Sequence, residues 1–135
     1  MGDAQRGGFP SADVRVPTFD DAHLLEWLEA DGLVHIDDLD FGLIVSGRDG
    51  VVVAYNANES ARSGLRRDTV IGRNFFVDVA PCVNNYLVAE RYTDVEELDE
   101  QLDYVFTFRM RPTPVRLRML VGKGSPRQYL AVRSR

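Results

Sequence analysis

The sequence predicts an α+β domain in which short helices lie on one side of a five-stranded antiparallel sheet. Two apolar segments, FGLIVSG and VVVAYN, flank the turn RDG at residues 48–50, which is typical of a β-hairpin. Three more apolar segments, YVFTFRMR, VRLRMLV and QYLAVR, follow near the C-terminal end and are separated by proline and glycine. Helix formers broken by glycine lie between the two groups, so helices and strands are segregated along the chain.

Composition favours one globular domain and excludes several classes of protein. The chain has 135 residues, of which 44% are apolar and 27% charged. No apolar run approaches the roughly 20 residues that span a bilayer, and the N-terminus resembles no secretory signal, so we expect a cytoplasmic protein without a membrane partner. A net charge of −5 argues against a nucleic-acid partner. One cysteine and two histidines complete no structural metal motif.

The first forty residues are expected to form an arm and a cap, and residues 41–135 the core. Residues 1–18 have no apolar period and predict a mobile arm. Asp20 or Asp21 is expected to cap a short helix, AHLLEWLEAD, that ends at Gly32. Its apolar stripe is Leu24, Leu25, Trp27 and Leu28.

Charge is distributed unevenly along the chain. Residues 1–40 carry ten acidic residues, whereas residues 105–135 carry eight basic residues and no acidic ones. One interpretation is two solvated surfaces of opposite sign. The other is that the acidic segment docks on the outer face of the sheet, where four arginines are expected, with the apolar stripe supplying most of the docking free energy. These arginines are Arg109, Arg111, Arg116 and Arg118.

Helices of different length are predicted between the hairpin and the last strands. After Asn56, glycines at positions 64 and 72 divide the sequence into two or three short helices. A longer helix is expected over about 86–101, and a strand with one aromatic face follows. That face comprises Tyr104, Phe106, Phe108 and Met110. Pro112 and Pro114 are expected to interrupt pairing and mark the turn.

Three polar side chains follow the second strand at intervals of four residues. A helix that begins where the strand ends would place Tyr55, Glu59 and Ser63 on one face, where they could converge on one ligand oxygen. The alternative is that Tyr55 simply ends the strand, Glu59 is solvated and Ser63 is a small helix-end residue.

Cys82 is a second candidate site residue. It follows Pro81, and a helix that begins near Asn84 or Asn85 would favour its thiolate form. The alternative is an inert core cysteine. Both histidines precede it in the acidic N-terminal segment, so no base accompanies it, and we expect no enzyme.

Several of these segments together resemble the photoactive yellow protein family. The resemblance is carried by the run FG at Phe41, YNANE at residues 55–59, VIGRNFFVDVAPC at residues 70–82 and YVFTFRMRPTPV from Tyr104, and it covers roughly residues 41–135. It implies a PAS-fold blue-light photoreceptor that holds p-coumaric acid as a thioester and signals by photoisomerisation, proton transfer from a buried Glu and release of the N-terminal cap.

The resemblance also assigns residues to this site. Cys82 matches the attachment cysteine, Tyr55 and Glu59 match residues that hydrogen-bond the phenolate oxygen, and Ser63 stands where a threonine supports that tyrosine. Other matched positions around the pigment are Leu65, Phe75, Pro81, Phe106, Phe108 and Met110. Leu65 replaces an arginine of the family pattern, and Phe108 replaces a tyrosine.

A different function remains open at this point. The rival hypothesis is a PAS module that binds other ligands or proteins and carries no pigment. The downstream signalling partner is left open, and the expectation on assembly extends to a weak homodimer.

Overall fold

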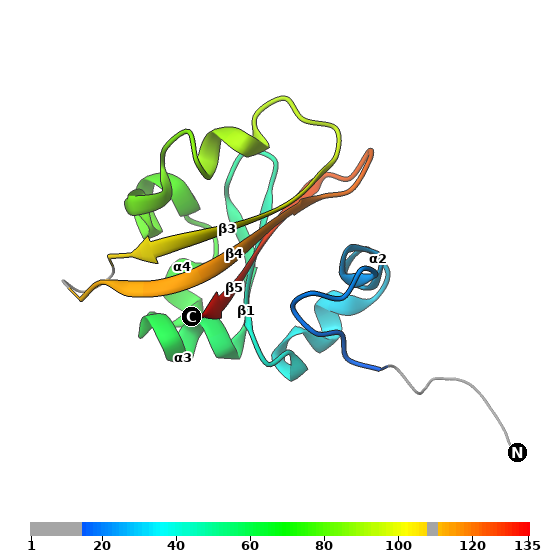
Figure 1. The fold of residues 1–135 in the computed structure, drawn as a ribbon, viewed down its shortest axis with the longest axis horizontal. Coiled ribbons are helices and arrows are strands. Elements are labelled where there is room, and N and C mark those ends of the chain that lie inside the picture. The colour runs from blue at the N-terminus through cyan, green and yellow to red at the C-terminus, as the bar shows by residue number, and fades with distance from the viewer. Residues whose placement is uncertain (1–14, 108–110) are drawn as a thin grey trace, which may run out of the picture.

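Five antiparallel strands form a single sheet in the order β2-β1-β5-β4-β3 (Figure 1). The computed structural model describes residues 15–107 and 111–135. The strands are β1 (Gly42–Gly47), β2 (Val52–Tyr55), β3 (Leu98–Phe106), β4 (Thr113–Val121) and β5 (Arg127–Ser134). The predicted α+β class and the predicted strand number are confirmed.

Short helical segments cover both faces of the sheet. The segments are α2 (Leu24–Glu29), the 3₁₀ helix η1 (Gly32–Asp38), α3 (Ala57–Ser63), α4 (Arg67–Val70), the π-helix η2 (Phe75–Val79), and the 3₁₀ helices η3 (Pro81–Val83) and η4 (Ala89–Tyr92). Figure 1 shows α3 and α4 on one side of the sheet and α2 on the other. No helix in the described ranges is long and apolar enough to cross a membrane.

The first hairpin forms as the sequence predicts. β1 pairs with β2, with Ile44 opposite Tyr55. The connecting turn needs Gly50, whose φ of 87° is one that residues with side chains rarely adopt. The Asp49 carboxylate supports the turn by accepting a hydrogen bond of 3.0 Å from the backbone N–H of Val51.

The predicted long helix over about 86–101 is wrong. Only Ala89–Tyr92 is helical there, and the chain reverses at Asp94, whose φ is 58°. β3 then begins at Leu98, which pairs with Val121 of β4. The apolar spacing fits a helix, but pairing along the whole of β4 satisfies the backbone of this segment in an extended form.

The expected effect of the two prolines is only partly observed. Pro114 lies inside β4, opposite Val105, instead of interrupting the pairing. β5 pairs with β4 only from Val115 onward, and the carbonyl of Pro114 accepts a hydrogen bond from the backbone N–H of Arg135. A proline is tolerated here because it stands at the end of the β4–β5 ladder.

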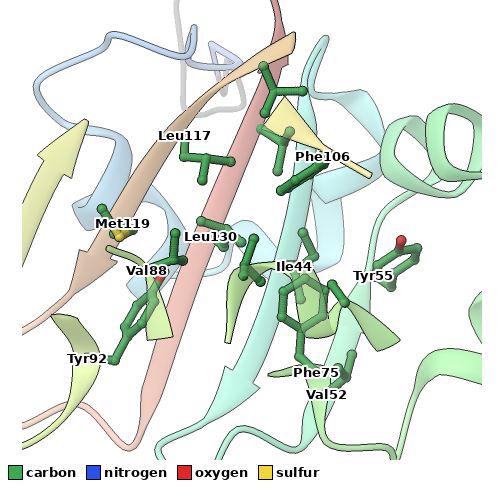
Figure 2. Packing of buried hydrophobic residues seen from close by; sticks show 14 of the residues in the cluster. Ile44, Val52, Tyr55, Phe75, Val88, Tyr92, Phe106, Leu117, Met119 and Leu130 are labelled. Carbon is green, nitrogen blue, oxygen red and sulfur yellow. The ribbon is translucent and has the colours of Figure 1, made fainter. Parts of the chain in front are cut away.

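Two buried clusters lie on opposite faces of the sheet. The inner cluster, on the side of α3 and α4, is shown in Figure 2. It includes Ile44, Val52, Tyr55, Phe75, Val88, Tyr92, Phe106, Leu117, Met119 and Leu130. The outer cluster includes Phe19, Leu24, Leu28, Ile36, Leu39, Phe41, Leu43, Val45, Leu120, Tyr129 and Ala131. Because side chains alternate along a strand, Leu43 and Val45 join the outer cluster while Ile44 joins the inner one.

The N-terminal segment docks through apolar side chains, as predicted for the stripe on its helix. Leu24 and Leu28 are completely buried, and Leu25 and Trp27 pack on them at the edge. The predicted aspartate cap is wrong. His23 is the residue at the helix N-cap, and the Asp21 carboxylate accepts a hydrogen bond from the backbone N–H of His23.

The expected attraction between acidic segment and basic strands takes another form. Asp20 contacts Arg133 at 3.2 Å. The arginines of β4, however, pair mainly with aspartates of the neighbouring strand β3: Arg118 with Asp99 and Arg116 with Asp103. Arg118 is buried beneath the N-terminal segment and donates to backbone carbonyls of that segment. Arg118 thus lies on the outer face where the N-terminal segment docks, as expected, whereas Arg109 is outside the described residues.

Candidate functional site

Helix α3 positions the three spaced polar side chains, and Asn56 and Gly64 define its ends. The Asn56 side chain accepts a hydrogen bond of 3.0 Å from the backbone N–H of Glu59, which is a helix N-cap. Gly64 ends the helix with a φ of 78°, and its N–H donates to the carbonyl of Ser60. The helix therefore begins two residues after the last residue of β2, and Glu59 and Ser63 face the sheet.

Asn56 also joins α3 to the segments beside it. Its side chain accepts from the backbone N–H of Leu43 in β1 and donates to the carbonyls of Ile36 and Phe41. The residue is fully buried. Because Asn56 also caps Glu59, one side chain connects the candidate site to the segment that carries η1.

Tyr55 and Ser63 form the first part of the site. Their hydroxyl oxygens lie 2.9 Å apart, and both residues are buried. Burial raises the pKa of Tyr55 well above its ordinary value, and the nearby Glu59 carboxylate raises it further. Tyr55 is therefore neutral and keeps a proton to donate.

Glu59 is the buried carboxyl of the site. No part of the residue is exposed to solvent, and its Oε1 accepts a hydrogen bond from Arg62. Desolvation raises the pKa of Glu59 to about 7, while the Arg62 guanidinium opposes that rise. Its Oε2 is buried without a hydrogen-bond partner among the described residues. A buried oxygen in this condition marks a place where a hydrogen-bonding ligand would be stabilised.

Cys82 lies in a fixed loop on the same side of the sheet. The thiol is free, partly buried and packed against the inner cluster. Its carbonyl accepts a hydrogen bond of 2.7 Å from the Tyr104 hydroxyl, and the Asn85 amide donates to that hydroxyl at 2.6 Å. These contacts tie the loop to β3.

The helix expected to begin near Asn84 or Asn85 is absent. Cys82 is itself within the 3₁₀ turn η3, and the Asn85 side chain accepts from the backbone N–H groups of Leu87 and Val88 in a loop. The next helical segment begins only at Ala89. Asparagine forms such local side-chain turns readily, and here that turn replaces the expected helix.

The remaining sequence-predicted positions are distributed around the inner cluster. Phe75 and Phe106 are buried within it, as Figure 2 shows, and Leu65 packs on it from the loop after α3. Pro81 is exposed at the start of the turn that carries Cys82. Phe108 and Met110 lie outside the described residues.

Sequence reasoning missed three residues that shape this region: Arg62, Asn85 and Tyr104. A basic residue three positions after Glu59 on a helix is a recognised pairing signal, so Arg62 could have been found. Asn85 and Tyr104 contact each other across 19 positions, and no local pattern reveals such a pair. Among the residues that the structure describes, no group of histidine, cysteine, aspartate and glutamate could hold a metal ion.

Comparison with known proteins identifies relatives of this chain. It is 38% identical to photoactive yellow protein of Rhodothalassium salexigens over 65% of this chain and 73% of that protein. It is 37% identical to photoactive yellow protein of Halochromatium salexigens over 62% and 70%, respectively. No protein-family model matches the chain.

A solved structure gives the same result at the level of the fold. The photoactive yellow protein domain of the sensor histidine kinase Ppr from Rhodospirillum centenum superposes with a TM-score of 0.73 at 37% identity, covering 81% of this chain and 98% of that domain. The five-stranded sheet and its flanking short helices are thus those of a PAS-fold sensor or photoreceptor domain. With this fold and with relatives of such identity over most of their length, the chain belongs to the photoactive yellow protein family.

Proposed function

We propose that this chain is a blue-light receptor that holds p-coumaric acid as a thioester on Cys82 and signals through its N-terminal segment. The observation that carries the proposal is the buried Oε2 of Glu59, which lacks a partner among the described residues. The Glu59 carboxylate acts on the pKa of the buried Tyr55 hydroxyl, which in turn contacts Ser63. Membership of the photoactive yellow protein family supplies the class of ligand.

The polar residues fit a phenolic oxygen. Ser63 Oγ already accepts a hydrogen bond of 3.2 Å from the backbone N–H of Leu65, so its own proton is available to Tyr55. Tyr55 can then donate its proton to a ligand, and Glu59, when protonated, can donate from Oε2. Two donors would stabilise an anionic oxygen that burial among aromatic rings would otherwise disfavour.

The other end of the ligand fits Cys82. The chain has one cysteine, and that thiol is free and borders the inner cluster that also contains Tyr55, Phe75 and Phe106. When bound, p-coumaric acid supplies absorption of blue light and isomerisation about its double bond. Tyr104 and Asn85 hold the carbonyl of Cys82, so the anchor stays fixed while the opposite end of the ligand can move.

Glu59 would link the ligand to the rest of the domain. Its raised pKa lets it carry a proton near neutral pH, and after isomerisation Glu59 would give that proton to the phenolate oxygen of the ligand and become a carboxylate. That carboxylate would keep Arg62 at Oε1 but have no partner at Oε2, and a buried oxygen without a hydrogen bond destabilises the packing around it. Asn56 connects Glu59 to the carbonyl of Ile36, so the N-terminal segment is the part of the structure that would respond.

Reconstitution tests the proposal. Purified protein is incubated with an activated p-coumaroyl ester, denatured and measured by mass spectrometry, with Cys82→Ala as the control. We expect the wild type to gain one coumaroyl group and colour, and the control to gain neither while it folds normally by circular dichroism. An unmodified wild type would instead favour a PAS module without a pigment, and a modified Cys82→Ala would show that the anchor is wrong.

A further inference from the structure

Arg62 places a cation inside the proposed site. Its side chain is only 15% exposed, and its guanidinium donates to Oε1 of Glu59, one turn earlier on α3. The guanidinium carbon also lies 5.7 Å from the centre of the Phe106 ring. Arg62 therefore lies between the buried carboxyl and an aromatic side chain of the inner cluster, in a position where its charge is little screened by water.

Strand β1 leaves room for this pair. A side chain at Gly42 would overlap Glu59 Oε1, and its Cβ would lie 3.1 Å from the Arg62 guanidinium. The absence of a side chain at this position lets carboxyl and guanidinium lie directly on the β1 backbone. The pair is thus shaped by two elements, α3 and β1.

Few other charged or titratable groups act on Glu59. Tyr55 at the end of β2 is neutral because burial raises its pKa, and Ser63 on α3 carries no charge. Gly42 is the β1 residue at the pair, and within the described part of the chain Arg62 is the charged residue that shifts the pKa of Glu59. Ionisation of Glu59 therefore depends on two opposing effects, desolvation and the guanidinium.

A ligand hydroxyl at Oε2 shares one proton with Glu59. With the proton on Glu59 the ligand oxygen is an anion, and with the proton on the ligand Glu59 is the anion. The total charge of the site is the same in both forms, so the balance depends on which oxygen is closer to the cation. In the structure the guanidinium contacts Glu59 directly.

We propose that Arg62 sets the position of this proton. By stabilising the Glu59 carboxylate, it makes a fraction of the protein molecules hold the ligand with its hydroxyl protonated, as a donor to Oε2. The proposal rests on the proposed function for the identity of the ligand. It adds a specificity-determining role for Arg62, namely control of whether the site holds a phenol or a phenolate.

The first experiment uses the ligand-free protein and needs no pigment. Side-chain carboxyl carbons of glutamate are labelled with ¹³C, and Glu59 is titrated by NMR in the wild type, Arg62→Gln, Arg62→Lys and Arg66→Gln. Arg66 is an exposed arginine paired with Asp68 and serves as the matched control. We expect the Glu59 midpoint to rise by about 1 to 3 pH units in Arg62→Gln and to be nearly unchanged in Arg62→Lys and Arg66→Gln.

The second experiment uses protein loaded with the activated p-coumaroyl ester, after mass spectrometry has shown attachment. Absorption spectra in the dark give the ratio of the near-ultraviolet band of the phenol to the visible band of the phenolate. We expect this ratio to fall about tenfold or more in Arg62→Gln, the equivalent of at least one pH unit. Arg62→Lys should restore the wild-type ratio, which a merely structural role would not require.

The outcomes separate the two proposals. If the Glu59 midpoint is equal in the wild type and Arg62→Gln, or if the visible band weakens in Arg62→Gln, the role of Arg62 is overturned; the second result would mean that the guanidinium pairs with the phenolate. If no pigment attaches, the proposed function fails and the ligand-free titration alone decides the role of Arg62. Arg62→Met replaces Arg62→Gln if circular dichroism shows that the latter does not fold.

Discussion

Two ionisable side chains are buried on opposite faces of the same sheet, and their surroundings differ. On the outer face, Arg118 makes a bidentate pair with Asp99, with both distances at 2.9 Å, and donates to the carbonyls of Phe19 and Asp21. On the inner face, Glu59 is paired through one oxygen only, and the other oxygen has no partner within the described ranges. Both side chains are less than 5% exposed.

This difference separates a structural contact from a responsive one. A buried ion whose hydrogen bonds are satisfied holds two segments in one arrangement, here the N-terminal segment against β4. A buried carboxyl with an unsatisfied oxygen and a raised pKa can change its charge within the physiological pH range. The outer face therefore supplies stability, and the inner face supplies sensitivity to a ligand or a proton.

The largest effect is expected from breaking the outer contact. Arg118→Met should lower the free energy of unfolding by about 4 kcal/mol, because it removes the buried donor to the carbonyl of Phe19, one of two donors to the carbonyl of Asp21, and the partner of Asp99. Urea denaturation measures it. The control Arg116→Met removes a more exposed pair with Asp103 and should cost about 0.5 kcal/mol. Equal costs for both variants would contradict the structural role given to Arg118.

A smaller effect is expected from the pH dependence of the inner face. The pKa of Glu59 is raised from 4.5 to about 7 by burial, so the folded protein binds this proton more tightly than the unfolded chain does. Its contribution to stability is complete below about pH 4.5 and is lost as the pH rises through about 7, in total about 3 kcal/mol. Urea denaturation at a series of pH values should show this loss in the wild type and not in Glu59→Gln.

The matched control for this experiment is Glu97→Gln, which alters an exposed carboxyl. It should keep the wild-type pH dependence. A Glu59→Gln protein that loses stability with pH as the wild type does would mean that another group is responsible.

The smallest expected effect is the loss of unfolding free energy when one tyrosine hydroxyl is removed from each face. Tyr55→Phe removes the hydrogen bond to Ser63, and Tyr129→Phe removes that to Glu29, which is 2.5 Å long and partly exposed. We expect losses of about 1 kcal/mol and about 0.5 kcal/mol, respectively, because water can replace a partner only at the outer site. Thermal unfolding of the two variants checks the order, and the reverse order would refute the contrast in burial.

Local sequence signals account for much of the fold. The hairpin at residues 42–55, the helix after Asn56 and the strands after Pro112 each have turn residues or alternation in the sequence itself. The segment over about 86–101 was misjudged because its apolar spacing also fits a helix, and only its pairing with β4 decides for a strand. Pairing between distant segments cannot be deduced from a local period.

For the candidate site, too, local spacing predicts some of the residues and misses others. Spacing by four placed Glu59 and Ser63 on one buried face of α3, after Tyr55 at the strand end. It could not show that Arg62 would turn inward, because an arginine near a helix end is usually solvated. Docking of the N-terminal segment on the face of Arg118 was one of the two sequence interpretations, but the hydrogen bonds from Arg118 to backbone carbonyls of that segment have no signal in the sequence.

The order of the strands has a consequence for the synthesis of this protein. β1 pairs with β5 in the middle of the sheet, so Gly42 cannot pair with Val132 until that much later residue has been translated. Sheets with such distant partners form slowly, and a ribosome delivers their first strands well before the partners exist. The helices that carry Glu59 and Cys82 are translated in that interval without a sheet to pack on, so a ligand that needs both residues can be received only after translation has passed β5.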